Sequence, residues 1–142
     1  MNTIIAGAID EKGYIFGMNK KGFNGPRALS ELFANPLDAH AKKIICKITK
    51  EFIYIIDDGH GMDIHGHENL WQAQRENHSG EKSTGVSGFG AKPSTKKLSN
   101  DTTVTYFSKT TDGPYCKSSA PWKKMVEDGK YTGMIEISEM NS

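Results

Sequence analysis

Apolar and polar positions along the chain predict a first helix that begins after residue 24. Asn24-Gly25-Pro26 combines a capping residue with a proline suited to a first helical turn, and helical periodicity follows from Arg27 to His40. Its apolar residues fall on one face, while Glu31, Asn35 and Asp38 share the opposite one. We expect these three polar side chains to point away from the core.

Strands are predicted before and after this helix in the sequence. Residues 3 to 18 alternate apolar and small residues around a turn-like cluster at 10 to 13, which predicts a short hairpin. Residues 43–48 and 52–56 are rich in β-branched and aromatic side chains and predict an antiparallel pair. Two further strands are predicted at 102–107 and 133–138, linked by an irregular stretch that contains Pro114 and Pro121. The mixture indicates an α/β fold.

The region between these strands predicts a short helix and a loop. The helix is expected from Asn69 to Glu76, and residues 77 to 90 are polar and rich in glycine, which is typical of a loop that closes over a site.

Composition narrows the class of protein. A chain of 142 residues with 36% hydrophobic and 25% charged residues predicts one globular domain spanning 1–142. The net charge of +1 gives no general attraction to nucleic acid, and the apolar runs are too short to span a membrane. The first residues lack the basic leader and long apolar core of a signal peptide. Cys46 in a predicted strand and Cys116 in a polar loop are expected to be free thiols, which favours a cytoplasmic or nuclear location.

The first helix carries a candidate catalytic pair. Glu31 and Asn35 lie one helical turn apart, where a carboxylate could deprotonate a water and an amide oxygen could bind Mg²⁺. A solvated helix face is the alternative. Pro36 predicts either a kink beside Asn35 or a helix that ends earlier.

Two glycine-containing segments complete the candidate chemistry. At 57–62 a carboxylate at a strand end could accept a hydrogen bond from an exocyclic amine, with an ordinary turn as the alternative. At 85–92 backbone N–H groups could bind phosphates beside Lys92, with a flexible linker as the alternative. Ala91 stands where a P-loop requires lysine, so this segment is not a P-loop.

Together the three segments resemble the N-box (31–39), G1 box (57–62) and G2 box (85–90) of the GHKL superfamily, and the resemblance covers about residues 27 to 137. That superfamily includes DNA gyrase and type II topoisomerases, heat-shock chaperones, histidine kinases, MutL and the MORC proteins. The resemblance implies the Bergerat fold, an α/β (α+β) two-layer sandwich with helices on one face of a mixed, largely antiparallel sheet. ATP would lie between helices and a lid at 77–92.

The resemblance also implies a role for each motif residue. Asp57 would bind the adenine amino group, Asn35 would bind Mg²⁺, and Glu31 would be the general base for water attack on the γ-phosphate. The remaining pocket residues would be Asp38, Gly59, Gly61 and Met62 around the nucleotide, Gly85, Gly88, Gly90 and Lys92 over the phosphates, and Thr132 as a second adenine contact.

The expected function is that of an ATPase module in a topoisomerase-like or MORC-like DNA-associated system. Gly-Phe-Gly-Ala-Lys at 88–92 is similar to eukaryotic type II topoisomerases, whereas Asp-Asp-Gly-His-Gly-Met at 57–62 is closer to MORC and chaperone members. The family analogy suggests a homodimer formed on nucleotide binding and a partner that is DNA or a DNA-processing protein. Pro36 and the lack of sequence for a transducer domain predict slow hydrolysis. The lack of a preceding dimerisation helix with a phospho-acceptor histidine disfavours a histidine kinase.

Three alternatives stay open at this point. A metal site could be built from His60, Asp63, His65 and His67, although in the GHKL interpretation residues 63 to 67 form a solvated loop. A non-catalytic module could use nucleotide only to switch a partner interface. Lysines could form a local DNA-binding surface, namely Lys42, Lys43, Lys47, Lys50, Lys92, Lys96 and Lys97.

Overall fold

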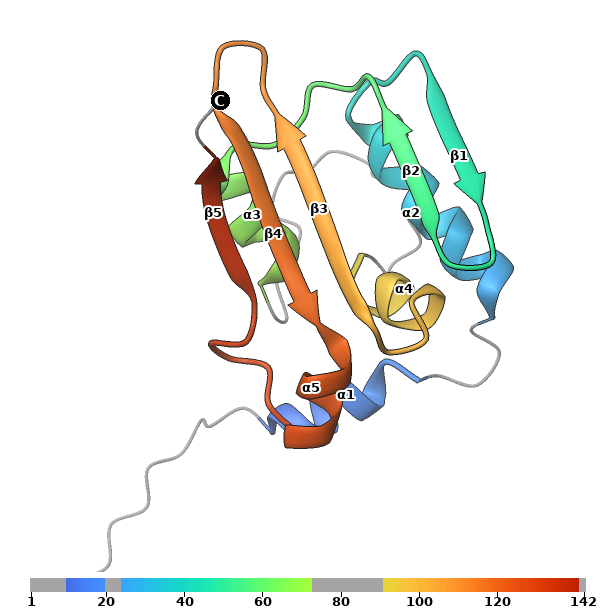
Figure 1. Ribbon diagram of the computed structural model, residues 1–142, viewed down its shortest axis with the longest axis vertical. Coiled ribbons are helices and arrows are strands. Elements are labelled where there is room, and N and C mark those ends of the chain that lie inside the picture. The colour runs from blue at the N-terminus through green and yellow to red at the C-terminus, as the bar shows by residue number, and fades with distance from the viewer. Residues whose placement is uncertain (1–9, 20–23, 73–90, 141–142) are drawn as a thin grey trace, which may run out of the picture.

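A computed structural model describes residues 10–19, 24–72 and 91–140 of the chain (Figure 1). Along the chain these residues form α1 (Glu11–Gly17), α2 (Gly25–Asp38), β1 (Ile44–Ile48), β2 (Ile53–Asp57), α3 (Ile64–Trp71), α4 (Ala91–Leu98), β3 (Thr103–Lys109), β4 (Tyr115–Pro121), α5 (Trp122–Asp128) and β5 (Glu136–Met140).

The strands form two antiparallel sheets, β1-β2 and β3-β4-β5. Figure 1 shows the five strands side by side, with α2, α3 and α4 on one face and α1 and α5 at one end. This arrangement confirms the expected α+β sandwich with helices on one face and the predicted pairing of 43–48 with 52–56, in which Cys46 lies opposite Ile55. None of the helices in the described ranges is long and apolar enough to cross a membrane.

Large side chains fill the space between the three-stranded sheet and the helices. Trp122, Met125 and Ile15 are fully buried, and Trp71 packs edge-on against both Trp122 and Tyr106, at ring-centroid distances of 6.1 and 5.7 Å. On β3 and β4 the burial alternates, so one side of each strand faces this core. Because Trp71 belongs to α3, this helix connects the core to the chain segment that precedes Ile64.

The opposite face of the sheets carries exposed apolar side chains and lysines. Phe107 is 64% exposed and Tyr115 is 49% exposed. The ammonium group of Lys117 lies 5.9 Å from the Phe107 ring centroid, and that of Lys109 lies 4.9 Å from the Tyr115 ring centroid. These cation-π contacts place charge directly over the aromatic surface.

Capping explains where two sequence predictions were wrong. Residues 11–17 form α1 and not a strand of a hairpin, because the Asp10 carboxylate accepts a hydrogen bond from Gly13 N (3.0 Å) at the helix start. Residues 1–9 lie outside the described residues. The helix predicted at 69–76 corresponds in part to α3, which begins at Ile64 because Asp63 caps it through Gly66 N (2.8 Å); residues 73–76 lie outside the described residues.

The stretch between the last predicted strands is regular. It forms β4 and α5, so Cys116 lies buried on a strand and not in a polar loop. The two cysteines are free thiols, as predicted. The strands predicted at 102–107 and 133–138 are confirmed as β3 and β5 with shifted ends. Pro121 is both the last residue of β4 and the N-cap of α5, so this proline lies at the junction of the two elements.

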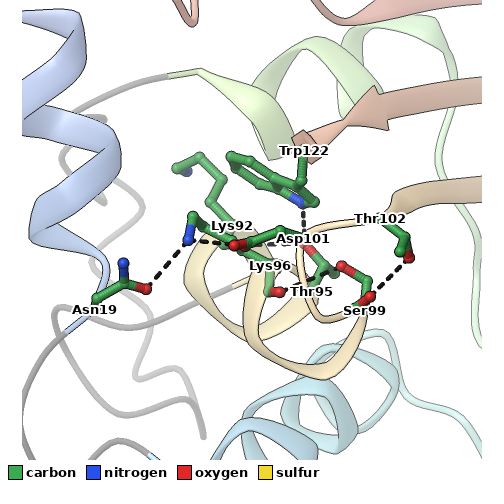
Figure 2. A network of polar contacts seen from close by, with 8 residues as sticks. All are labelled: Asn19, Lys92, Thr95, Lys96, Ser99, Asp101, Thr102 and Trp122. Carbon is green, nitrogen blue, oxygen red and sulfur yellow. Dashed lines mark hydrogen bonds and ion pairs between the residues drawn. The ribbon is translucent and has the colours of Figure 1, made fainter. Parts of the chain in front are cut away.

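Buried polar contacts fix α4 against its surroundings (Figure 2). The Lys96 side chain is 4% exposed, and its ammonium nitrogen lies 2.9 Å from Asp101 Oδ1 and 3.1 Å from Asn19 Oδ1. The indole N–H of Trp122, on α5, donates to Thr95 Oγ1 of α4 (3.2 Å). Helix α4 is therefore tied to the residues just after α1, to α5 and to its own C-terminal turn.

Replacing Asp101 with Asn is expected to lower the free energy of unfolding by about 1–3 kcal/mol, because it leaves a buried ammonium without its counter-charge. Asparagine tolerates the left-handed backbone of this position (φ 59°) and so isolates the effect of charge. Urea denaturation measures the change. Lys97→Met, at the exposed neighbouring lysine, serves as the control and should change stability by less than about 0.5 kcal/mol.

Candidate functional site

The C-terminal end of α2 meets the glycine-rich segment that follows β2. The His60 amide donates to the Ala39 carbonyl (3.0 Å), and a Cβ on Gly59 would lie 2.8 Å from the Ala39 Cβ. Only a glycine permits this approach. Two motifs that are separate in the sequence, 31–39 and 57–62, are thereby brought into contact.

The adjacent carboxylates Asp57 and Asp58 have different surroundings. Asp57 pairs with Ile44 in the β1-β2 register, on the side shared by the half-buried pair of Cys46 and Ile55, which faces the helices. The Gly59 amide donates to Asp57 Oδ1 (2.8 Å). This turn holds the Asp57 carboxylate at the helix-covered end of the sheet.

Asp58 closes the loop between α2 and β1. Its Oδ1 accepts hydrogen bonds from the Lys43 amide (2.8 Å) and the Lys42 amide (2.7 Å). These bonds, led by that from Lys43, hold the pKa of Asp58 below its ordinary value. Asp58 therefore fixes the loop between α2 and β1, whereas Asp57 Oδ1 accepts a hydrogen bond within its own turn, from Gly59.

The end of the glycine-rich segment rests on β3. Gly61 has φ +75°, and a Cβ there would collide with the Lys109 carbonyl oxygen. The Ser108 hydroxyl donates to the Met62 carbonyl (2.8 Å). The segment 57–62 thus begins on one sheet and is anchored on the other.

Helix α2 places its polar residues differently from the prediction. Asn35 and Asp38 are exposed, as expected, but Glu31 is only 4% exposed. The buried row on this helix runs through Ala28, Glu31 and Ala34, and α2 packs against α4. Small side chains in such a row let another helix approach closely, so Glu31 is covered although the larger apolar residue Leu37 is 54% exposed.

The helix also continues through Pro36 to Asp38, so it does not end early. Pro36 is buried, and its carbonyl accepts a hydrogen bond from the Ala41 amide (3.0 Å) just beyond the helix.

The residues predicted to close over phosphates are only partly described. Gly85, Gly88 and Gly90 lie outside the described residues, as does most of the predicted lid at 77–92. Lys92 is in α4, and its ammonium donates to the Leu70 carbonyl of α3 (3.3 Å). Burial lowers the pKa of Lys92. In this structure Lys92 links α4 to α3.

Thr132 lies at a different place from Asp57. It lines an open pocket of about 430 Å³ with Glu68, Asn69, Trp71, Gln72, Tyr131, Gly133, Ile135 and Ile137. The Glu11 carboxylate accepts hydrogen bonds from the amides of Thr132 (2.6 Å) and Tyr131 (3.2 Å), and the bonds to Thr132 are the first cause of its lowered pKa. The contacts of the described residues do not bring Thr132 together with Asp57.

The histidines after the glycine-rich segment do not form a metal site. Nowhere in residues 10–19, 24–72 and 91–140 do three or more His, Cys, Asp or Glu side chains gather so as to hold a metal ion. His60 and His65 are exposed, whereas His67 is fully buried on α3, which corrects the prediction of a solvated loop at 63–67. Burial lowers the pKa of His67, and the nearby Asp63 partly opposes this effect.

Sequence reasoning missed the buried partners of His67. They are Ser118 of β4, which is buried and also accepts a hydrogen bond from the Trp71 indole, and the half-buried Ser108 of β3. Recognising Asp63 as an N-cap would have placed His67 and Trp71 four residues apart on one face of a helix.

Comparison with known families agrees with this geometry. The family model described as "Histidine kinase-, DNA gyrase B-, and HSP90-like ATPase" matches residues 24–139. The match spans most of the chain, so the chain belongs to this GHKL-type ATPase family and is an ATP-binding domain. No curated protein matches the chain.

Proposed function

We propose that this domain binds ATP together with Mg²⁺ between α2, the segment 57–62 and the chain that precedes α4, and that it hydrolyses ATP slowly. The observation that carries the proposal is the contact between the end of α2 and the segment 57–62, which places Asp57 on the helix-covered side of the sheet. A carboxylate held in this way can accept a hydrogen bond from the adenine amino group.

The polar face of α2 suits the phosphate end of the ligand. Asn35 has an exposed side chain on the last turns of the helix, and its amide oxygen is the type of ligand that Mg²⁺ accepts. Bound Mg²⁺ would neutralise phosphate charge. Asp38 lies three residues further along the same exposed surface, with Gly59, Gly61 and Met62 as backbone walls of the pocket.

Glu31 is the proposed general base, one helical turn before Asn35. Lys92, Thr132 and the glycines at 85, 88 and 90 complete the proposed nucleotide contacts. To reach a nucleotide bound at Asp57, Lys92 would have to break or lengthen its hydrogen bond to Leu70. Thr132 would have to do the same with its hydrogen bond to Glu11.

A second function is favoured by one observation, the burial of Glu31. A base that is 4% exposed is not accessible to an attacking water unless the helices move. The alternative is therefore a switch module that binds nucleotide without turnover and acts through a partner.

The wider role is proposed from motif resemblance. The sequences at 57–62 and 88–92 support an ATPase module of a topoisomerase-like or MORC-like system, with DNA or a DNA-processing protein as partner and a homodimer formed on nucleotide binding. Residues 1–142 are proposed to act as a single domain.

Calorimetric titration of the chain with ATP and ADP, each with and without Mg²⁺, tests the binding proposal. We expect one site per chain for both nucleotides and tighter ATP binding when Mg²⁺ is present, because the cation offsets the charge of the third phosphate. Failure of both nucleotides to bind, in titrations at two temperatures, would refute the proposal. Equal ATP affinity with and without Mg²⁺ would refute the metal role of Asn35.

A further inference from the structure

A continuous chain of hydrogen bonds connects the protein core to the backbone of segment 57–62. The two ring nitrogens of His67 each contact a serine hydroxyl: Nδ1 lies 2.7 Å from Ser118 Oγ, and Nε2 lies 2.6 Å from Ser108 Oγ. The Trp71 indole N–H donates to Ser118 Oγ (2.8 Å), and the Ser108 hydroxyl donates to the Met62 carbonyl (2.8 Å). Two strands, α3 and the nucleotide-facing segment all contribute to this chain.

The direction of every hydrogen bond in the chain follows from its two ends. The Ser108 proton points to the Met62 carbonyl, so Ser108 Oγ accepts from His67, and Nε2 must carry the ring proton. In the neutral ring Nδ1 is then an acceptor and takes the Ser118 proton, which leaves Ser118 Oγ to accept from the Trp71 indole. One tautomer of His67 satisfies all four side chains.

This arrangement fixes a hydroxyl that could otherwise rotate. A serine proton can turn toward any nearby acceptor. Here the Nε2 proton of His67 occupies an Oγ lone pair, so the Ser108 proton is directed at the Met62 carbonyl. Next to this bond, Gly61 packs on the Lys109 carbonyl, so residues 61 and 62 are seated together on the end of β3.

We propose that Ser108, with its hydroxyl oriented by His67, is a positioning residue for nucleotide binding. It holds the Met62 carbonyl, and through it the turn from Asp57 to Met62, in the conformation that receives the base. Neither Ser108 nor His67 contacts the ligand. The proposal rests on the proposed ATP site and adds to it a supporting group from a strand that the three motifs do not include.

The test compares alanine variants of Ser108 and Ser118, the two serines in this series of hydrogen bonds. In Ser108→Ala the Met62 carbonyl loses its donor, and the dissociation constant for Mg-AMPPNP in calorimetry should rise about five- to tenfold. Ser118→Ala breaks the bonds to Trp71 and Nδ1 and leaves the Ser108 bond to Met62 in place. It should lower the melting temperature at least as much and change the dissociation constant by less than about twofold.

Conservative replacement separates positioning from general stability. Ser108→Thr keeps the hydroxyl on a half-buried strand position and should restore wild-type affinity within about twofold. If Ser108→Ala does not fold, Ser108→Cys and Ser118→Cys give the same comparison, since a thiol is a weaker donor than a hydroxyl.

Each outcome has a separate meaning. If the wild-type chain does not bind Mg-AMPPNP, the proposed function fails and this inference fails with it. If the wild-type chain binds and the variants at 108 and 118 lose affinity equally, or neither loses it, the ATP site stands and the positioning role of Ser108 is wrong.

Discussion

Replacing Asp57 with Asn is expected to abolish the rise in melting temperature that Mg-AMPPNP produces in the wild-type chain. A ligand at one hundred times its dissociation constant stabilises the fold by about 2.7 kcal/mol, which corresponds to several degrees. The asparagine oxygen can still accept the Gly59 amide at 2.8 Å, so the turn is preserved. Its NH₂ group, however, would meet the adenine amino group donor to donor, and affinity should fall at least about 100-fold.

The neighbouring carboxylate provides a matched control for this experiment. Asp58→Asn keeps an oxygen that can accept the Lys42 and Lys43 amides, and it removes the same charge one residue away. We expect its nucleotide-induced shift to equal that of the wild-type chain. A full shift in Asp57→Asn, or the loss of the shift in both variants, would show that Asp57 is not the adenine contact.

Replacing Glu31 with Gln is expected to reduce phosphate release at least about 100-fold, while the dissociation constant for Mg-AMPPNP stays within about threefold. A general base contributes roughly 10²–10⁴ in rate, and glutamine keeps the size of the side chain but cannot take a proton from water. A phosphate-release assay with saturating Mg-ATP measures the change, and calorimetry measures binding.

Glu127→Gln on α5 is the control, since this exposed glutamate lies outside the proposed site. Equal phosphate release from Glu31→Gln and the wild-type chain would remove Glu31 from the mechanism. Nucleotide binding by the wild-type chain without any phosphate release would favour the switch module instead.

Elements with a strong local signal could be predicted from the sequence. Asn24 and Pro26 marked the start of α2, and β-branched runs marked β1 and β2 with their pairing. The family resemblance implied that the segments 31–39 and 57–62 belong to one site, and the glycine at 59 leaves room for the contact with Ala39. These features depend on residues near one another in the chain, or on conformations that only glycine adopts.

Other features depend on tertiary contacts and escaped prediction. The burial of Glu31 follows from packing of α2 on α4, which a single helical wheel cannot reveal. The helix at 11–17 was hidden because the Asp10 cap outweighs an alternating pattern. The environment of His67 needs serines 41 and 51 residues away, brought to it by β3 and β4.

The lysines on the uncovered sheet face have a consequence for how the protein behaves at high concentration. Aromatic and aliphatic side chains in a flat, exposed array favour association between sheets. The ammonium groups of Lys109 and Lys117 lie over the Tyr115 and Phe107 rings, so two such faces cannot approach without burying like charges. We therefore expect these lysines to oppose aggregation, and we expect their acetylation to favour association of the exposed faces.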